Sequence, residues 1–381
     1  MWPRAGVIEP DPVSARSYFS QAELDRAGDF RGGQRALYGG SLLIQGGLLI
    51  LLVRRPPRWL RRRARWPVLA GAAAGAGSSL ALAVAPLPLS AIAHSRAVDV
   101  GLSTQAWGEW AADVARSDAL GALLAAAGAA LALALIRRFP RHWWAPGSVA
   151  LVAVGALLLY AGPVVIAPLF NRFERLPPGP VRSDVLELAE RAGVTVGEVY
   201  TVDASRRNTA ANAYVTGLGG TKRVVLYDNL IERFPREQLR LVLAHELAHV
   251  RHRDVQRGLL WLALVAPAAL LAIKRLSERF GASDERATAA AVPALALSLA
   301  LVALALTTIS HQLSRRVELR ADSFALRLTN APQAFVALQR GLVLRNVADP
   351  DPPGWVTALL GTHPPAIERI GAAVAYGRRR T

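Results

Sequence analysis

The chain has 381 residues, 52% of them hydrophobic and only 19% charged, with a mean hydropathy of +0.26, which is too apolar for an ordinary soluble or disordered protein and predicts a membrane protein. The net charge of +17 gathers in blocks such as Arg61-Arg62-Arg63 beside apolar runs, so we interpret it as the flanks of membrane spans and expect no nucleic-acid partner. The absence of cysteine excludes disulfides, thiolate zinc sites and cysteine nucleophiles.

Uncharged stretches long enough to form membrane helices divide the chain, because a bilayer core of about 30 Å needs about 20 helical residues. Six such stretches are found, at 36–53, 67–93, 119–136, 147–170, 258–273 and 287–310. The fifth is short, but Arg257 and Lys274 bracket it as interfacial anchors would. The first 35 residues are polar and precede any apolar segment, so no signal peptide is expected.

These stretches predict five regions in chain order. They are a polar cap or tail at 1–35, four spans within 36–170, a polar stretch at 171–257, a hairpin of two spans at 258–310, and a second polar stretch at 311–381. Both polar stretches are too long and too regularly patterned to be simple loops. They are therefore expected to fold into a domain outside the membrane.

The stretch at 171–257 has mixed secondary-structure signals. A helical pattern at 183–192 ends at Gly193. Strand-like runs follow at 198–202, 213–217 and 223–227. A glycine-rich turn at Gly219-Gly220 separates the last two runs, which predicts a hairpin. A helix is expected after Pro235, leading towards the fifth span, and 311–381 is expected to be mostly helical with a proline-rich break at 349–354.

The helix after Pro235 carries the motif His245-Glu246-Leu247-Ala248-His249. Spacing of four residues places both imidazoles on one helical face, where they can bind one Zn²⁺ while Glu246 reaches a water beside it. The alternative is a surface helix with two histidines by chance. The rest of the helix is apolar, so its polar residues need a buried partner, which favours a metal.

A third protein ligand must be His, Glu or Asp, because the chain has no cysteine. Glu318 is the preferred candidate, and Asp322, one turn later, could hydrogen-bond a ligand histidine. Spacing alone favours the alternative, an arginine-rich interfacial helix with ordinary Glu–Arg pairs. His363 and Arg369, near a helix start, could donate to a developing oxyanion.

The other histidines are assigned no chemistry at this stage. His252 and its neighbour Asp254 are interpreted as solvated helix residues or, less often, as partners of the ligands. The histidines that flank spans are expected at the membrane interface; they are His94, His142 and His311.

Several of these segments resemble one family, the integral-membrane zinc endopeptidases that include the type I CAAX prenyl protease and the bacterial HtpX-like proteases. The most specific is 314–322, similar to the stretch that carries the family's glutamate ligand and an aspartate four residues later. The segment 362–370 resembles its C-terminal histidine–proline motif and arginine. Further similar segments are 243–249, 212–214 and 222–228, with 101–105 and 166–171 resembling the prenyl-protease branch.

The resemblance implies a mainly α, polytopic membrane protein of about six transmembrane helices, with a gluzincin-like zinc metalloprotease domain that contains a small β-sheet. It implies a zinc metalloendopeptidase, a hydrolase with one Zn²⁺ per chain, acting on peptides or proteins that are lipidated, membrane-associated or misfolded. Eukaryotic prenyl proteases have seven spans, and a glycine is common in that branch where this chain has Ala248.

The resemblance also implies roles for individual residues. The implied zinc ligands are His245, His249 and Glu318, with Asp322 supporting a ligand. The implied catalytic residues are Glu246 as the base, and His363 and Arg369, which stabilise the oxyanion or orient Glu318. The implied substrate-binding residues are Asn212, Ala213 and Tyr214.

The membrane side of the active site is predicted differently by two arguments. The loops at 54–66, 137–146 and 274–286 carry 7, 3 and 4 basic residues, so the positive-inside rule places them in the cytoplasm and the zinc site outside. The resemblance implies a multi-pass protein of the plasma membrane whose zinc domain faces the cytoplasm, and we favour that side. Two other functions stay open, a catalytically inactive zinc-binding membrane adaptor and a transporter.

Overall fold

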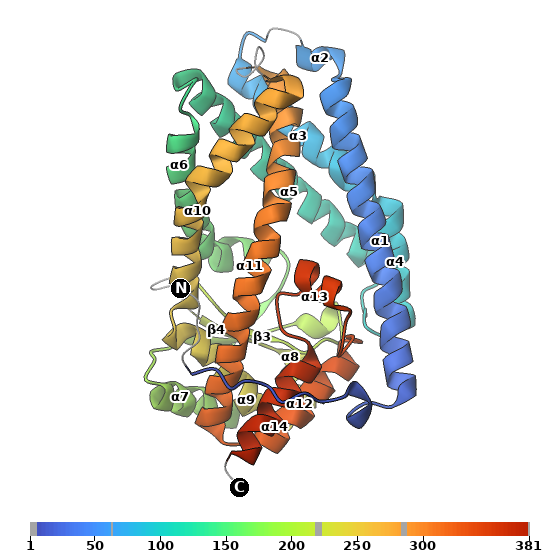
Figure 1. Cartoon of the computed structure of the whole chain (residues 1–381), viewed down its shortest axis with the longest axis vertical. Coiled ribbons are helices and arrows are strands. Elements are labelled where there is room, and N and C mark those ends of the chain that lie inside the picture. The colour runs from blue at the N-terminus through green and yellow to red at the C-terminus, as the bar shows by residue number, and fades with distance from the viewer. Residues whose placement is uncertain (1–5, 62–63, 218–222, 283–287, 380–381) are drawn as a thin grey trace.

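Six long apolar helices form the upper part of the computed structural model, which describes residues 6–61, 64–217, 223–282 and 288–379 (Figure 1). Each is long and apolar enough to cross a membrane. They are α1 (Gln21–Arg54), α3 (Pro67–Val84), α5 (Trp107–Arg138), α6 (Trp144–Ala161), α10 (Asp254–Ser277) and α11 (Val292–Thr329). The prediction of a polytopic, mainly α membrane protein with about six spans is confirmed.

A smaller domain lies below these helices in Figure 1. We call residues 171–217, 223–253 and 311–379 the lower domain. Its helices are α7 (Pro180–Ala192), α8 (Asp228–Arg233), α9 (Arg236–Arg251), α12 (Pro332–Arg345), α13 (Gly354–Leu360) and α14 (Ala366–Arg378). The remaining helical segments are α2 (Arg58–Arg61), α4 (Leu87–Asp99), η1 (Ala15–Ser17), η2 (Gly162–Ile166), η3 (Ala167–Leu169), η4 (Ala204–Arg206), η6 (Glu278–Ala282) and η7 (Ala289–Ala291).

The lower domain contains a mixed four-stranded sheet. Its strands are β1 (Phe173–Arg175), β2 (Glu198–Val202), β3 (Ala213–Thr216) and β4 (Arg223–Tyr227), in the order β1-β2-β4-β3. The antiparallel pairing of β3 with β4 agrees with the expected hairpin, whose turn at Gly219-Gly220 lies outside the described residues. Strand β1 is too short to give a sequence signal. Because β3 is the last strand in the order, one of its edges is left open within the sheet.

The sheet supports the helix that carries the histidine motif. Val224 and Leu226 of β4 share a buried core with Leu188 of α7 and with Leu243 and Leu247 of α9. Every one of these five side chains is almost completely buried. The apolar face of α9 is thereby fixed on the sheet, which leaves its opposite face for the histidines.

Two helix boundaries differ from those predicted by the apolar runs. The run at 67–93 is divided between α3 and α4, because Pro86 and Pro88 lack the amide protons that a continuous helix needs. The helix expected to lead from Pro235 towards the fifth span ends at Arg251, and Arg253 adopts a left-handed conformation with φ 54° before α10 begins. That turn directs Asp254 back towards α9.

Residues 6–19, in the segment expected to be a polar cap or tail, pack against the lower domain. Ile8 is 4% exposed within the main core of that domain, and its amide donates to Ser323 Oγ at 2.8 Å. The amide of Asp11 donates to the carbonyl of Gly371 at 3.1 Å. We call residues 6–19 the N-terminal strap; it crosses the lower domain in Figure 1 before α1 begins.

Replacing Ile8 by alanine should destabilise the lower domain, because it removes a buried side chain from the core. The expected cost is about 2–4 kcal/mol, seen as a lower melting temperature of the detergent-purified protein. Leu186→Ala is the control, since Leu186 is 50% exposed on α7. Equal melting temperatures for the two variants would contradict the packing assigned to the N-terminal strap.

Candidate metal centre

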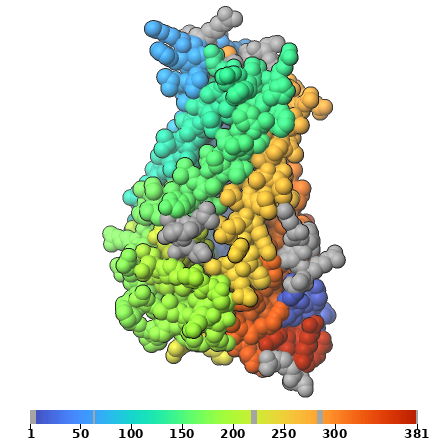
Figure 2. Space-filling view, turned by 90° about the vertical axis from the view of Figure 1, so that its left-hand side faces the viewer, coloured from blue at the N-terminus to red at the C-terminus, as the bar shows by residue number. Residues whose placement is uncertain are grey.

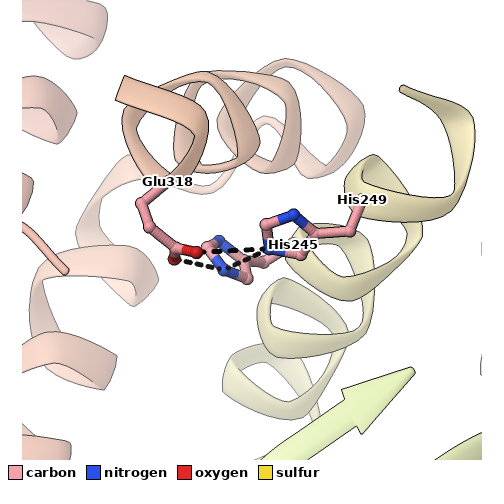
Figure 3. A group of neighbouring side chains, drawn as sticks. All are labelled: His245, His249 and Glu318. Atoms are coloured by element: carbon pink, nitrogen blue, oxygen red, sulfur yellow. Dashed lines mark hydrogen bonds and ion pairs between the residues drawn. The ribbon is translucent and has the colours of Figure 1, made fainter. Parts of the chain in front are cut away.

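Side chains from two helices converge where α9 crosses α11. His245 and His249 extend from α9, and Glu318 extends towards them from the part of α11 that lies below its apolar run (Figure 3). His245 Nε2 lies 3.2 Å from Glu318 Oε2, and His249 Nε2 lies 3.7 Å from Glu318 Oε1. The two Nε2 atoms are 3.3 Å apart. The structure thus brings together the three residues predicted as ligands.

The spacing of these atoms fits a zinc ion. One ligand atom from each residue lies within 4.8 Å of the others. A tetrahedral Zn²⁺ with bonds of about 2.0–2.1 Å needs ligand atoms roughly 3.3–3.4 Å apart, close to the distances between these three side chains. The donor set of two imidazoles and one carboxylate is also one that zinc prefers.

Hydrogen bonds at the far side of each ring fix its orientation. His245 Nδ1 lies 2.9 Å from Asp322 Oδ1, and His249 Nδ1 lies 3.0 Å from Asp254 Oδ2. A carboxylate can only accept, so each Nδ1 carries the proton and donates it. When the rings carry no second proton, each Nε2 presents a lone pair towards the other Nε2 and the Glu318 carboxylate. Such a cluster of acceptors is stabilised by a positive charge among them, which a metal ion or a second proton on His245 can supply.

Arginines hold the two supporting carboxylates. Asp322 is completely buried and accepts from Arg369 Nε at 2.8 Å and Nη2 at 2.6 Å. Asp254 accepts from Arg320 Nη2 at 2.5 Å. Burial alone would lower the pKa of Arg369, but Asp322 more than offsets it and raises this pKa. Each of the two candidate ligand histidines is therefore supported by a carboxylate–arginine pair.

Sequence analysis assigned no role to Arg320, and it gave contact with a ligand as the less frequent role of Asp254. Asp254 was expected mainly as a solvated residue, whereas only 13% of its side chain is exposed and it contacts His249. It follows the left-handed residue Arg253, so helical spacing places it on the wrong face. A left-handed arginine has no clear sequence signal, and the contact could not be read from the pattern.

The carboxylates of Asp322 and Glu318 favour positive charge at the candidate metal centre. Burial lowers the pKa of His245, but Asp322 and Glu318 outweigh this and raise it to about 10. The place where a metal would bind is therefore one where the protein stabilises a cation. The pKa of Glu246 is raised, first because the carboxyl group is buried, although His245, His249 and the Val215 amide partly lower it. A raised pKa suits a carboxylate that exchanges protons near neutral pH.

A cavity of about 690 Å³ opens beside the three ligands. Among its lining residues are six predicted site residues: His245, Glu246, Asn212, Ala213, His363 and Arg369. The ring of His363 is 58% exposed and its Nδ1 lies 2.7 Å from Glu318 Oε2. Tyr214 does not line this cavity; its ring packs edge-on against Tyr227, with centroids 6.4 Å apart, and lines a different groove.

Comparison with known proteins gives two family matches. Residues 176–376 match the family model of peptidase family M48, and residues 79–172 match that of the CAAX prenyl protease N-terminal region with five membrane helices. The metalloprotease YhfN of Bacillus subtilis is 31% identical over 286 residues, which are 73% of this chain and 67% of YhfN.

More distant similarities extend to eukaryotic proteins. A CAAX prenyl protease 1 homologue of Oryza sativa is 31% identical over 214 residues, covering 52% of this chain and 48% of that protein. The chain therefore spans about half the length of this relative. The crystal structure of S. mikatae Ste24p superposes with a TM-score of 0.68 at 23% identity, covering 77% of this chain and 75% of that one. At this identity the likeness shows a shared fold.

Replacing Asp254 by asparagine should weaken metal binding, because the amide holds the Nδ1 proton of His249 less strongly. Loss of such a partner typically costs about 10–100-fold in metal affinity. Zinc retained after dialysis against graded chelator concentrations measures this, with Asp351→Asn, at an exposed position, as the control. Unchanged zinc retention in Asp254→Asn would refute the support assigned to this residue.

Proposed function

The chain belongs to peptidase family M48, and on this basis we propose that it is a zinc-dependent endopeptidase embedded in the membrane. Family membership makes it a metalloprotease, and the six apolar helices make it a multi-pass membrane protein. One Zn²⁺ per chain would be held by His245, His249 and Glu318. The observation that carries this proposal is the convergence of these three side chains beside Glu246 at the wall of the cavity.

Proton transfer in peptide hydrolysis falls to Glu246. When bound by His245, His249 and Glu318, a zinc ion would supply Lewis acidity to the scissile carbonyl and to a nearby water. Glu246 accepts a proton from the attacking water and returns it to the nitrogen of the leaving amine. Its raised pKa supports this role, because the same carboxyl must both take up and release a proton.

His363 and Arg369 complete the proposed catalytic set in different ways. His363 contacts Glu318 and is half exposed to the cavity, a position from which it can orient the ligand or donate to the oxyanion. Arg369 Nε and Nη2 both donate to Asp322. Arg369 therefore acts through Asp322 and His245, which supports the orienting role over direct contact with the oxyanion.

The substrate is proposed to be a peptide bound in an extended form along the open edge of β3. The interaction of Glu246 with the Val215 amide places this strand next to the proposed base. An extended peptide can add to such an edge through main-chain hydrogen bonds, with Asn212 and Ala213 lining the cavity at its start. Tyr214 of the same strand lies on the other face and would support the strand rather than touch the peptide.

The apolar lining of the cavity supports apolar, lipidated or membrane-associated substrates. Phe335, Leu338 and Leu241 are buried side chains at its wall. Some relatives are named CAAX prenyl proteases, which also favours lipid-modified peptides. Such substrates are accessible to an enzyme whose site is joined directly to membrane helices.

The protein is proposed to lie in the plasma membrane with the lower domain in the cytoplasm. Six crossings place both chain ends on the same side, consistent with the contact between the N-terminal strap and the lower domain. The basic loops at the opposite end argue for the reverse orientation. The two arguments predict opposite patterns of accessibility for the two ends of the molecule, which a labelling experiment distinguishes.

Glu246→Gln should abolish peptide hydrolysis while zinc stays bound, because glutamine keeps the shape but cannot accept the proton. The expected loss in kcat is about 10²–10⁴-fold. Cleavage of an unbiased peptide library by detergent-purified protein, with zinc quantified in parallel, measures both effects. Glu237→Gln, exposed on the same helix, is the matched control, and full activity in Glu246→Gln would eliminate this residue as the base.

Single introduced cysteines can report the orientation without background, because the chain has none. If the lower domain is cytoplasmic, Trp59→Cys, at a 51% exposed position at the opposite end, should react with an impermeant maleimide in intact cells. Ser14→Cys, in the exposed part of the N-terminal strap, should react only after the membrane is permeabilised. The opposite labelling pattern would place the active site outside.

A further inference from the structure

A second groove, of about 280 Å³, lies where the membrane helix α6 meets the sheet. Its lining comes from α6 and η2, from β1 and β3, and from Arg223 at the start of β4. Figure 2 shows the face on which α6, drawn in green, lies above the yellow-green residues of the sheet. The groove and the cavity beside Glu246 have no described lining residue in common.

Arg223 is a partly buried cation, and two nitrogens of its guanidinium are buried without an acceptor among the described residues. Its guanidinium lies between the rings of Phe173 and Tyr200, at 5.4 and 5.2 Å from their centroids. Nε and Nη2 are buried and have no hydrogen-bond partner among the described residues. Stacking uses the faces of the guanidinium, whereas its N–H groups point outward in its plane. The rings therefore stabilise the charge but leave these two donors unsatisfied, and a buried N–H group without an acceptor is costly.

The other residues around the groove are mostly apolar. Leu158, Leu159, Pro163 and Ile166 line its upper side, and its described lining contains no aspartate or glutamate. A comparable arginine, Arg207, is instead paired with Asp113 at 2.7 Å. The groove thus combines one unsatisfied guanidinium with hydrocarbon walls, which complements a ligand with an anionic group attached to an apolar chain.

The position of the groove indicates where that ligand comes from. It lies at the end of a helix that can cross the membrane, near the boundary between the apolar spans and the lower domain. Val164, Val165 and Leu169, next to the groove, are 54%, 62% and 56% exposed, as expected for a surface in contact with lipid. Arginine binds phosphate through its planar set of donors, and phospholipids carry their phosphate at this depth.

We propose that this groove binds an anionic phospholipid, with its phosphate on Arg223 and part of an acyl chain along α6. Tyr214 and Thr216 of β3 also line the groove, so the bound lipid contacts the strand whose Val215 amide interacts with Glu246. Lipid binding here does not require peptidase activity and can be measured independently of it.

Native mass spectrometry of the full chain with phosphatidylglycerol or phosphatidylcholine tests the proposal. The wild-type protein should retain phosphatidylglycerol about five- to tenfold more strongly, and Arg223→Gln should remove this preference. The net charge of +17 also attracts anionic lipids, so Arg233→Gln, an exposed arginine on α8, is the charge-matched control. It should keep the preference.

A second variant tests the acyl part of the groove and does not depend on Arg223. Gly162 lines the groove, and a Cβ added there would meet no atom within 4 Å, so Gly162→Leu should fold and fill the space. Gly162→Leu should also lose the preference for phosphatidylglycerol. If Arg223→Gln does not fold, the result with Gly162→Leu decides whether the groove binds this lipid.

Three results would overturn the proposal. The first is an unchanged lipid preference in Arg223→Gln or, if that variant does not fold, in Gly162→Leu. The second is equal competition by inorganic phosphate with no effect of Gly162→Leu, which would indicate a simple anion site. The third is an increased KM for peptides in Arg223→Gln with unchanged lipid binding, which would assign the guanidinium to a carboxylate of the substrate.

Discussion

Ligand atoms of His245, His249 and Glu318 are held within 4.8 Å of one another between α9 and α11, and this arrangement needs a positive charge among them, from a metal ion or a second proton on His245. The protein maintains it through an outer layer of charges. Asp322 and Asp254 fix the two rings, and Arg369 and Arg320 fix the carboxylates. These contacts join α9, α10, α11 and α14. The candidate metal centre and the packing of the lower domain therefore depend on the same contacts. Substitutions in these contacts should change both metal affinity and the stability of the domain.

The same helices connect this network to the membrane. Helix α11 is continuous for 38 residues, from its apolar run to Thr329, and carries Glu318 and Asp322 beyond that run. Asp254 is the first residue of another candidate span, α10. The N-terminal strap contacts α11 at Ser323 before α1 enters its apolar run. A hydrolytic site joined to three membrane helices in this way is suited to substrates that are themselves held at the membrane.

The sequence predicts what depends on local periodicity. It indicates the six apolar helices, the strands β2, β3 and β4, and the helical face that carries His245 and His249, because each depends on a pattern within one segment. The sequence does not predict contacts between residues that are far apart in the chain, or contacts that depend on an irregular turn. The packing of Ile8 joins residues more than 300 positions apart, and Asp254 reaches His249 only because Arg253 is left-handed. Glu318 is intermediate, since its spacing alone favours an ordinary surface pair and only similarity to a family indicates a ligand.

X-ray absorption spectroscopy at the zinc edge of the purified protein tests the central claim most directly. The arrangement of His245, His249 and Glu318 predicts one zinc per chain with two imidazole nitrogens and one carboxylate oxygen at about 2.0–2.2 Å, and it predicts that Glu318→Gln loses the oxygen ligand or the metal. A spectrum that lacks the two imidazoles, or one that is unchanged in Glu318→Gln, would contradict it.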